Sequence, residues 1–294
     1  LFPQIQVISR ELYCGCLLEG ESDTEILNPY ETKEFLEYCR LMRKWREAGW
    51  IPENFLFSGQ NGRQLFREGK VFMTWSGVNL QERIIQAHLY SFSLGMLATG
   101  KAQVTTRTVQ ESGWGISSSC ANPEKAMELL DYLYTHPAVS NLLSNGIEGR
   151  EYLRISEHVI ALPSDSAAEV PGYSTEFSTF GNPLSNDVWA PMTEEEYAAL
   201  SQAYEAPQHY DALFGYTFLS TSVLPEIAAV KEVLDVYVPP LECGMVPDVE
   251  AGVAELQARL REAGMDRIIA ENQRQLDAWL AEQTAEISVE APEE

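Results

Sequence analysis

The sequence has few basic residues, and this shortage excludes two classes of direct partner. It holds 20 Lys and Arg against 44 Asp and Glu, which gives a formal net charge of −24. Nucleic acids and anionic membrane surfaces are bound by clustered Lys and Arg, so the charge argues against both. The sequence also lacks any run of about 18 apolar residues and therefore predicts no membrane-spanning helix.

Cysteine and histidine are scarce as well. The five cysteines are an odd number, and their spacing is not that of a zinc site. They leave the redox compartment undecided, because exported proteins that do without disulfides also have few thiols. The four histidines lie far apart and form no H-x-x-x-H pair. We therefore expect neither a bound metal nor a cofactor.

Motifs of catalysis are missing from the sequence. It contains no G-x-S-x-G elbow, no phosphate-binding loop and no dinucleotide glycine fingerprint. The run Glu194-Glu195-Glu196 invites a glycosidase interpretation, but adjacent acids also suit the first turn of a helix. We expect a protein that is not an enzyme. Because paired carboxylates can come from distant positions, a carbohydrate-active enzyme stays open as the lesser alternative.

Apolar residues make up 45% of the chain, enough to build a hydrophobic core. Helical spacing, Asn and Pro starts and Gly stops predict helices over residues 31–48, 60–68, 122–134, 137–146, 223–237, 248–263 and 265–284. Short strands or extended segments are predicted over 71–75, 104–109 and 113–116. Residues 71–75 are followed by Ser76-Gly77 and a further helix from about residue 78, the order of an α/β unit. The fold class is α/β, rich in helices, with few and short strands.

Several motifs, in the same order, resemble those of bacterial family 1 extracellular solute-binding proteins, the substrate-binding lipoproteins of ABC importers. The likeness covers about residues 25–285 and is closest to the LipO-like branch, whose C-terminal domain was catalogued as of unknown function. The stretches that carry it are residues 30–51, Phe66-Arg67-Glu68-Gly69-Lys70-Val71-Phe72-Met73, residues 116–127, residues 141–152 and Gln273-Arg274-Gln275-Leu276-Asp277-Ala278-Trp279. One departure is Phe72, where the family has a small residue.

The resemblance implies a type II periplasmic-binding-protein fold, in which two α/β lobes joined by hinge strands enclose the ligand. The N-terminal lobe is largely missing from this chain on that basis. Residues 1–95 are expected to begin the second lobe, 96–165 to return to the first, and 166–294 to complete the second with its C-terminal helices.

Six residues are the expected ligand contacts. Aromatic faces stack on sugar rings, and amides or hydroxyls select among ligand hydroxyl groups. The candidates are Trp75, Ser76, Asn79, Trp114, Asn182 and Tyr216. Four of them have a structural alternative: core packing for Trp75, bracing of a hinge for Trp114, turn formation for Asn182 and a purely structural role for Tyr216.

The function implied by the resemblance is capture of a small solute, an oligosaccharide by preference and a peptide as the alternative, by hinge closure. Delivery to ABC permease subunits would follow. We expect a monomer outside the cytoplasmic membrane, at the cell surface, attached by a lipid anchor that this sequence does not contain. The other hypothesis is a surface lipoprotein module that keeps the fold but binds a protein or peptidoglycan-derived partner and has no transport role.

Overall fold

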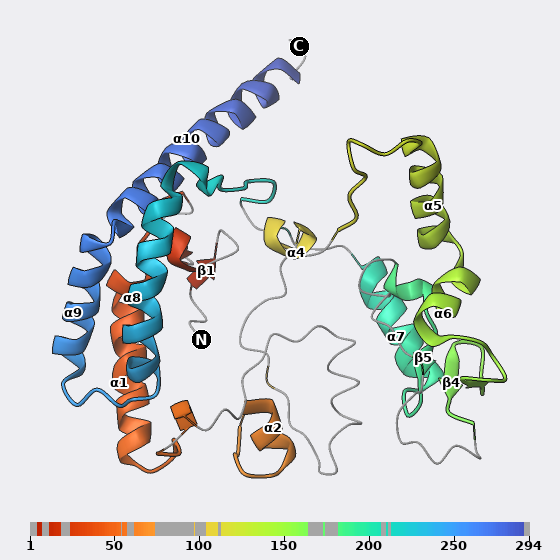
Figure 1. The fold of residues 1–294 in the computed structure, drawn as a ribbon, viewed down its shortest axis with the longest axis horizontal. Coiled ribbons are helices and arrows are strands. Elements are labelled where there is room, and N and C mark those ends of the chain that lie inside the picture. The colour runs from red at the N-terminus through yellow and green to blue at the C-terminus, as the bar shows by residue number, and fades with distance from the viewer. Residues whose placement is uncertain are drawn as a thin grey trace. The chain divides into compact units, whose positions relative to one another are not determined.

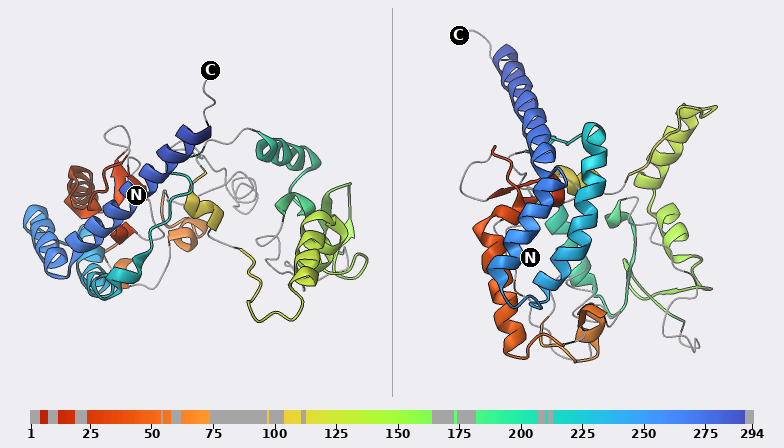
Figure 2. Two further views of the ribbon diagram at one scale, coloured as in Figure 1. Left: turned by 90° about the horizontal axis from the view of Figure 1, so that it is seen from above. Right: turned by 60° about the vertical axis from the view of Figure 1, so that its left-hand side comes forward.

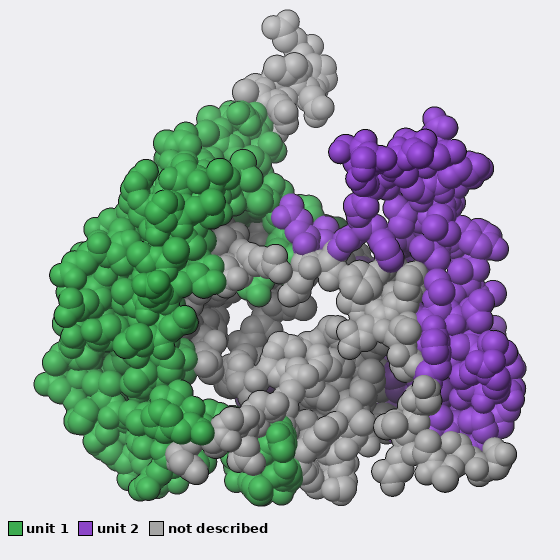
Figure 3. Space-filling model, in the orientation of Figure 1, with its two compact units in different colours: residues 1–75, 99–108, 209–294 green, residues 76–98, 109–208 purple. Residues whose placement is uncertain are grey.

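The computed structural model describes residues 5–7, 12–18, 24–53, 55–57, 62–73, 97, 104–110, 113–163, 173, 182–206, 210 and 213–290. The chain forms two compact units, coloured separately in Figure 3. Unit 1 comprises residues 1–75, 99–108 and 209–294, and unit 2 comprises residues 76–98 and 109–208. Each unit is described by itself. The expected assignment of 1–95, 96–165 and 166–294 to two lobes stays a prediction.

Unit 1 is built on four helices that lie side by side (Figures 1 and 2). These are α1 (Lys33–Glu47), α8 (Leu224–Glu242), α9 (Val249–Glu262) and α10 (Met265–Glu290). Their apolar faces meet in one cluster, in which Phe35, Leu256 and Ile268 are almost completely buried. Smaller elements of the unit are β1 (Ile5–Val7), β2 (Cys16–Leu18), α2 (Gly62–Arg67) and the 3-10 helices η1 (Leu12–Cys14), η2 (Pro29–Glu31), η3 (Phe55–Phe57) and η6 (Ser220–Val223).

Helix α1 forms where its sequence supplies a cap, an apolar stripe and a stop. The Thr32 hydroxyl accepts a hydrogen bond from the Phe35 backbone N–H at 3.2 Å, which satisfies one of the unpaired donors of the first turn. Phe35, Cys39 and Met42 recur at helical spacing and are buried. Gly49, at φ 75°, lies just beyond the helix, where a left-handed residue suits the turn. The predicted helix over 31–48 is confirmed.

The three predicted C-terminal helices are also confirmed. Asp248 caps α9, and its carboxylate accepts from the Ala251 N–H at 3.0 Å. Gly264 separates α9 from α10 at φ 98°, and a Cβ there would lie 2.6 Å from the Glu226 side chain. Helix α8 is longer than predicted, since it continues through Pro239 and Pro240 to Glu242. None of the helices in the described part of the chain is long and apolar enough to cross a membrane.

A buried amide joins three distant parts of unit 1. Asn272 on α10 is completely buried, and its Nδ2 donates to the Cys14 carbonyl at 2.6 Å. Its Oδ1 accepts from the Tyr216 hydroxyl at 2.6 Å. Buried polar groups that are fully paired in this way fix one packing of the elements that carry them.

Unit 2 contains two helices in sequence, a small sheet and a third helix. Helices α5 (Pro123–Thr135) and α6 (Pro137–Asn145) follow one another, and α7 is Glu194–Glu205. The sheet has the order β3-β4-β5, with β3 (Leu153–Arg154) antiparallel to β4 (Val159–Ala161) and β4 parallel to β5 (Val188–Trp189). The 3-10 helix η5 (Pro183–Ser185) precedes β5. The predicted helices over 122–134 and 137–146 are confirmed.

The structure does not contain the predicted strands among its described residues. Residues 106–110, expected to be extended, form the short helix α4 (Thr106–Gln110). Its start is fixed by the Thr105 hydroxyl, which accepts from the Thr108 N–H at 3.2 Å. Residues 113–116 and 71–73 pair with no strand in the described part of the chain, so those strand predictions are wrong there. Residues 74–75 and the helix expected from residue 78 lie outside the described residues.

We predict that Tyr216→Phe destabilises unit 1. The change removes the hydroxyl bound to Asn272 and leaves a buried oxygen short of a donor, which costs roughly 1–3 kcal/mol. Urea unfolding followed by circular dichroism measures the loss. Tyr237→Phe is the matched control, because that hydroxyl makes an exposed contact of 3.3 Å to Glu255. Equal stability of the two variants would contradict the role given to Asn272.

Candidate functional site

Three of the six predicted ligand contacts, Trp75, Ser76 and Asn79, lie outside the described residues. Their role stays a prediction. Trp114 belongs to the segment between α4 and α5, and 46% of its surface is exposed. A ligand contact by Trp114 also stays a prediction.

Asn182 stands immediately before η5 and acts as its cap. Its side-chain Oδ1 accepts from the Leu184 N–H at 3.0 Å. This contact is the turn-forming role that the sequence offered as the alternative to binding. Asn182 is half-buried, and the predicted ligand contact is neither supported nor excluded by its cap.

Tyr216 lies in the core of unit 1. It is 3% exposed, its ring centroid lies 5.8 Å from that of Trp279, and its hydroxyl is bound to Asn272. Burial, with Glu271 as a second cause, raises the pKa of Tyr216 well above its usual range. These contacts give Tyr216 a structural role, and a ligand contact by it stays a prediction.

The residues that hold the Asn182 segment in place were not found from the sequence. Asn141 on α6 donates to the Ser185 carbonyl at 3.2 Å and accepts from the Asp187 N–H at 2.8 Å. Asn145, one turn further, accepts from the indole N–H of Trp189 at 3.0 Å. Both amides are buried. Polar residues on a helix are usually solvated, so their spacing gave no signal of this role.

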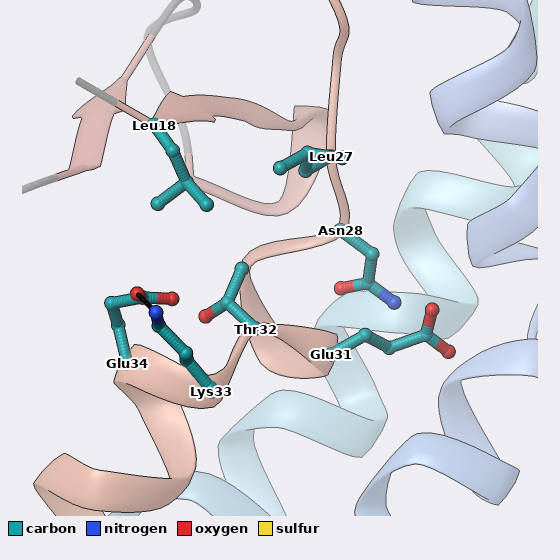
Figure 4. Close-up of a pocket in the computed structure, with 7 residues that line it drawn as sticks. All are labelled: Leu18, Leu27, Asn28, Glu31, Thr32, Lys33 and Glu34. Atoms are coloured by element: carbon teal, nitrogen blue, oxygen red, sulfur yellow. Dashed lines mark ion pairs between the residues drawn. The ribbon is translucent and has the colours of Figure 1, made fainter. Parts of the chain in front are cut away.

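Unit 1 contains a cavity of about 390 Å³ beside the start of α1. Figure 4 shows its lining: Leu18 and Leu27 on one side, Asn28, Glu31 and Thr32 from the segment before α1, and Lys33 and Glu34 from the first turn of α1. The Asn28 Nδ2 and Glu34 Oε2 atoms are buried and have no hydrogen-bond partner among the described residues. The lining therefore combines apolar side chains with polar and charged ones.

Unit 2 contains a cluster of three side chains of types that bind metals, namely Glu157, His158 and Glu194. The side chains of His158 and Glu194 bond to each other and to neighbouring groups. The His158 Nδ1 lies 2.5 Å from Glu194 Oε1, and Glu194 Oε2 accepts from the Ser156 hydroxyl at 2.6 Å. The His158 ring is stacked on Tyr197, with centroids 4.2 Å apart. These contacts hold the turn before β4 on the first turn of α7 and give His158 and Glu194 a structural role.

Comparisons with known proteins agree with this fold. Residues 212–281 match the domain of unknown function DUF3502. A carbohydrate ABC transporter substrate-binding protein of Streptococcus pneumoniae serotype 4 is 26% identical over 277 residues, which cover 90% of this chain and 53% of that protein.

Solved structures of an N-glycan transport solute-binding protein (NgtS) from Streptococcus pneumoniae show the same fold. One has a TM-score of 0.74 at 18% identity and covers 95% of this chain and 61% of the other. Its complexes with Man1GlcNAc and Man5GlcNAc match with TM-scores of 0.72 and 0.69, at 19% and 20% identity. They cover 95% of this chain and 62% and 61% of theirs. The chain thus spans between about half and three fifths of the length of these relatives.

Over most of its length the chain is similar to substrate-binding proteins of ABC transporters, and this likeness agrees with the resemblance that the sequence motifs carry. The predicted fold class is confirmed: a helix-rich α/β structure that corresponds to part of a periplasmic-binding-protein-like fold. The relatives are substrate-binding proteins, and their names connect them with carbohydrate transport.

We predict that Glu194→Gln removes a pH-dependent part of the stability of unit 2. Hydrogen bonds from Ser156 and His158 lower the pKa of Glu194 in the folded chain. A depressed carboxyl pKa stabilises the fold above the unfolded pKa, and this contribution is lost as the pH falls through the folded pKa. The melting temperatures of the two proteins should therefore differ at neutral pH and converge in acid. Glu195→Gln, one residue along, is the matched control. A constant difference at every pH would contradict the prediction.

Proposed function

We propose that the chain is part of an extracytoplasmic solute-binding protein that captures a neutral oligosaccharide for an ABC importer. The observation that carries the proposal is the fold match over 95% of the chain to a glycan transport protein whose complexes contain Man1GlcNAc and Man5GlcNAc. The sequence relative, named for carbohydrate transport, supports the same class of solute.

The charge of the chain narrows the class of ligand. A protein with a net charge of −24 repels anionic solutes, and it has only 20 Lys and Arg with which to pair phosphate or carboxylate groups. Mannosyl glycans carry no charge, so their capture involves no such repulsion. We therefore favour a neutral sugar over an acidic or phosphorylated one.

Binding requires no covalent step. Two lobes close around the sugar by a hinge motion, Trp75 and Trp114 offer stacking surfaces, and Ser76, Asn79 and Asn182 offer hydrogen bonds to hydroxyl groups. Closure stores the sugar until it is delivered to permease subunits. On this proposal the protein is a monomer without catalytic activity or cofactor, and it is held outside the cytoplasmic membrane by a lipid anchor.

The second candidate function is a surface lipoprotein module that binds a protein or peptidoglycan-derived partner without transport. Such a module would share the fold and the location of a transport protein, but it would bind no small solute. A carbohydrate-active enzyme is the third. When the protein is mixed with free sugars, the surface module predicts no binding and the enzyme predicts cleavage of the sugar.

Titration calorimetry tests the proposal on the product of the complete reading frame, because the relatives are longer than this chain. We expect heat of binding with the mannose–N-acetylglucosamine disaccharide and with larger neutral mannosyl glycans, and none with sugar phosphates. Recovery of every glycan unchanged supports a binding protein, whereas its cleavage would indicate an enzyme. No heat with any glycan would contradict the proposed function and favour the surface module.

In the same assay, Trp75→Ala is expected to raise the Kd for the disaccharide about 2- to 13-fold, the equivalent of roughly 0.5–1.5 kcal/mol of lost stacking. Trp50→Ala is the matched control, because Trp50 is a 70% exposed indole at the end of α1 in unit 1. An unchanged Kd for Trp75→Ala would remove Trp75 from the site while leaving the class of ligand intact.

A further inference from the structure

Unit 2 brings one imidazole and two carboxylates together at its surface. Glu157 and His158 lie in the turn between β3 and β4, and Glu194 is the first residue of α7. One ligand atom from each of these side chains lies within 4.8 Å of the other two. Imidazole nitrogen and carboxylate oxygen are ligand types with which proteins bind zinc. The two parts of the cluster are 36 residues apart in the chain, so the histidine spacing in the sequence does not reveal it.

Two of the three side chains are held in place by their neighbours. The His158 ring is stacked on Tyr197, with the ring planes 12° apart. The Glu194 carboxylate accepts hydrogen bonds from the Ser156 hydroxyl at 2.6 Å and from the His158 backbone N–H at 3.2 Å. Such surrounding contacts orient metal ligands and raise the affinity of a site. Glu157 is exposed, so its carboxylate is free of packing and is able to turn toward the other two.

The charge around the cluster is negative. In the described part of the chain, no Lys or Arg forms an ion pair with Glu157 or Glu194. The Arg154 guanidinium donates to the Glu157 carbonyl at 2.6 Å, but its charge is paired with Asp187 at 2.5 Å. Burial raises the pKa of the adjoining Tyr197, and the three carboxylates just named raise it further. A divalent cation would offset this excess of negative charge.

We propose that Glu157, His158 and Glu194 form a zinc site, with three protein ligands and water in the fourth position. Zn–N and Zn–O distances are about 2.0–2.2 Å, so ligand atoms around a tetrahedral ion lie roughly 3.3 Å apart. The three ligand atoms are close enough to reach this arrangement by small side-chain rotations. The ion then takes the place of the hydrogen bond of 2.5 Å between His158 Nδ1 and Glu194 Oε1.

The types of ligand favour zinc over the other common divalent cations. Calcium takes 6–8 oxygen ligands, and magnesium requires an octahedral set of oxygens, so a site with an imidazole among three ligands suits neither. Zinc accepts nitrogen and oxygen together in a four-coordinate site. The ion would join the turn before β4 to the start of α7 and so stabilise unit 2. This inference is independent of the proposed function, since it involves no sugar.

Competition with a chromophoric chelator measures zinc binding to the 294-residue chain. A Cys120→Ser background removes the one thiol that is not buried. Glu157→Gln is the test variant, because it neutralises one ligand and leaves the contact between His158 and Glu194 in place. Glu195→Gln is the matched control, because this exposed acid lies next to Glu194 but outside the cluster. Melting temperatures with and without Zn²⁺ provide a second readout.

We expect one Zn²⁺ to bind per chain, Glu157→Gln to raise its Kd about tenfold or more, and Glu195→Gln to leave the Kd nearly unchanged. Zn²⁺ should raise the melting temperature of the starting chain and of Glu195→Gln, and raise that of Glu157→Gln much less. Absence of zinc binding to the starting chain would overturn the proposal. An affinity that Glu157→Gln leaves unchanged would also overturn it, because the ion would then be held elsewhere. Tighter binding of Ca²⁺ than of Zn²⁺ would contradict the assignment of the metal.

Discussion

The packing of α1 against α8 and α9 is the contact on which unit 1 depends. It joins residues about 200 positions apart, and it buries Phe35 and Cys39 among Val230, Leu256 and Leu260. Complete burial of a large aliphatic or aromatic side chain contributes roughly 1.5–3 kcal/mol, so a few such residues offset much of the entropy lost in closing the chain. Asn272 then fixes the register, because its amide has to meet both the Cys14 carbonyl and the Tyr216 hydroxyl.

The described elements of unit 2 are held together more by polar contacts than by apolar ones. The amides of Asn141 and Asn145 hold the segment from η5 to β5, and the His158–Glu194 contact holds the turn before β4 on α7. These bonds specify geometry, but each contributes only about 0.5–1.5 kcal/mol net. Among the described residues, the two units therefore differ in the size of their hydrophobic clusters.

The helices were predictable because their signals are local. The caps at Thr32 and Asn122 and the stop at Gly264 act within one turn of where they stand in the sequence. The strands were not, since β4 pairs with β5 across almost thirty residues and each is too short to show alternation. Residues 106–110 illustrate the error, because threonines that alternate like a strand instead bond to one another at a helix start.

The candidate site was predictable in part for the same reason. The cap formed by Asn182 is a local contact, and the sequence offered it as one of two roles. The burial of Tyr216 beside Asn272 is a property of packing between segments 56 residues apart, and the sequence could not show it. The cavity beside α1 depends likewise on Leu18 and Leu27, which come from the strand and bridge that precede the helix.

Unit 1 has a large hydrophobic core, whereas the described part of unit 2 has a small hydrophobic cluster and is held largely by polar contacts. Hydrogen exchange of the backbone amides in the 294-residue chain tests this difference most directly. The account predicts that amides in the middle of α1, α8 and α9 exchange only through global unfolding of unit 1. Those of α5, α6 and α7 should exchange faster, by local or subglobal opening. Equal, slow exchange of all six helices would contradict this account, because the polar contacts of unit 2 would then stabilise it as much as the core of unit 1 stabilises unit 1.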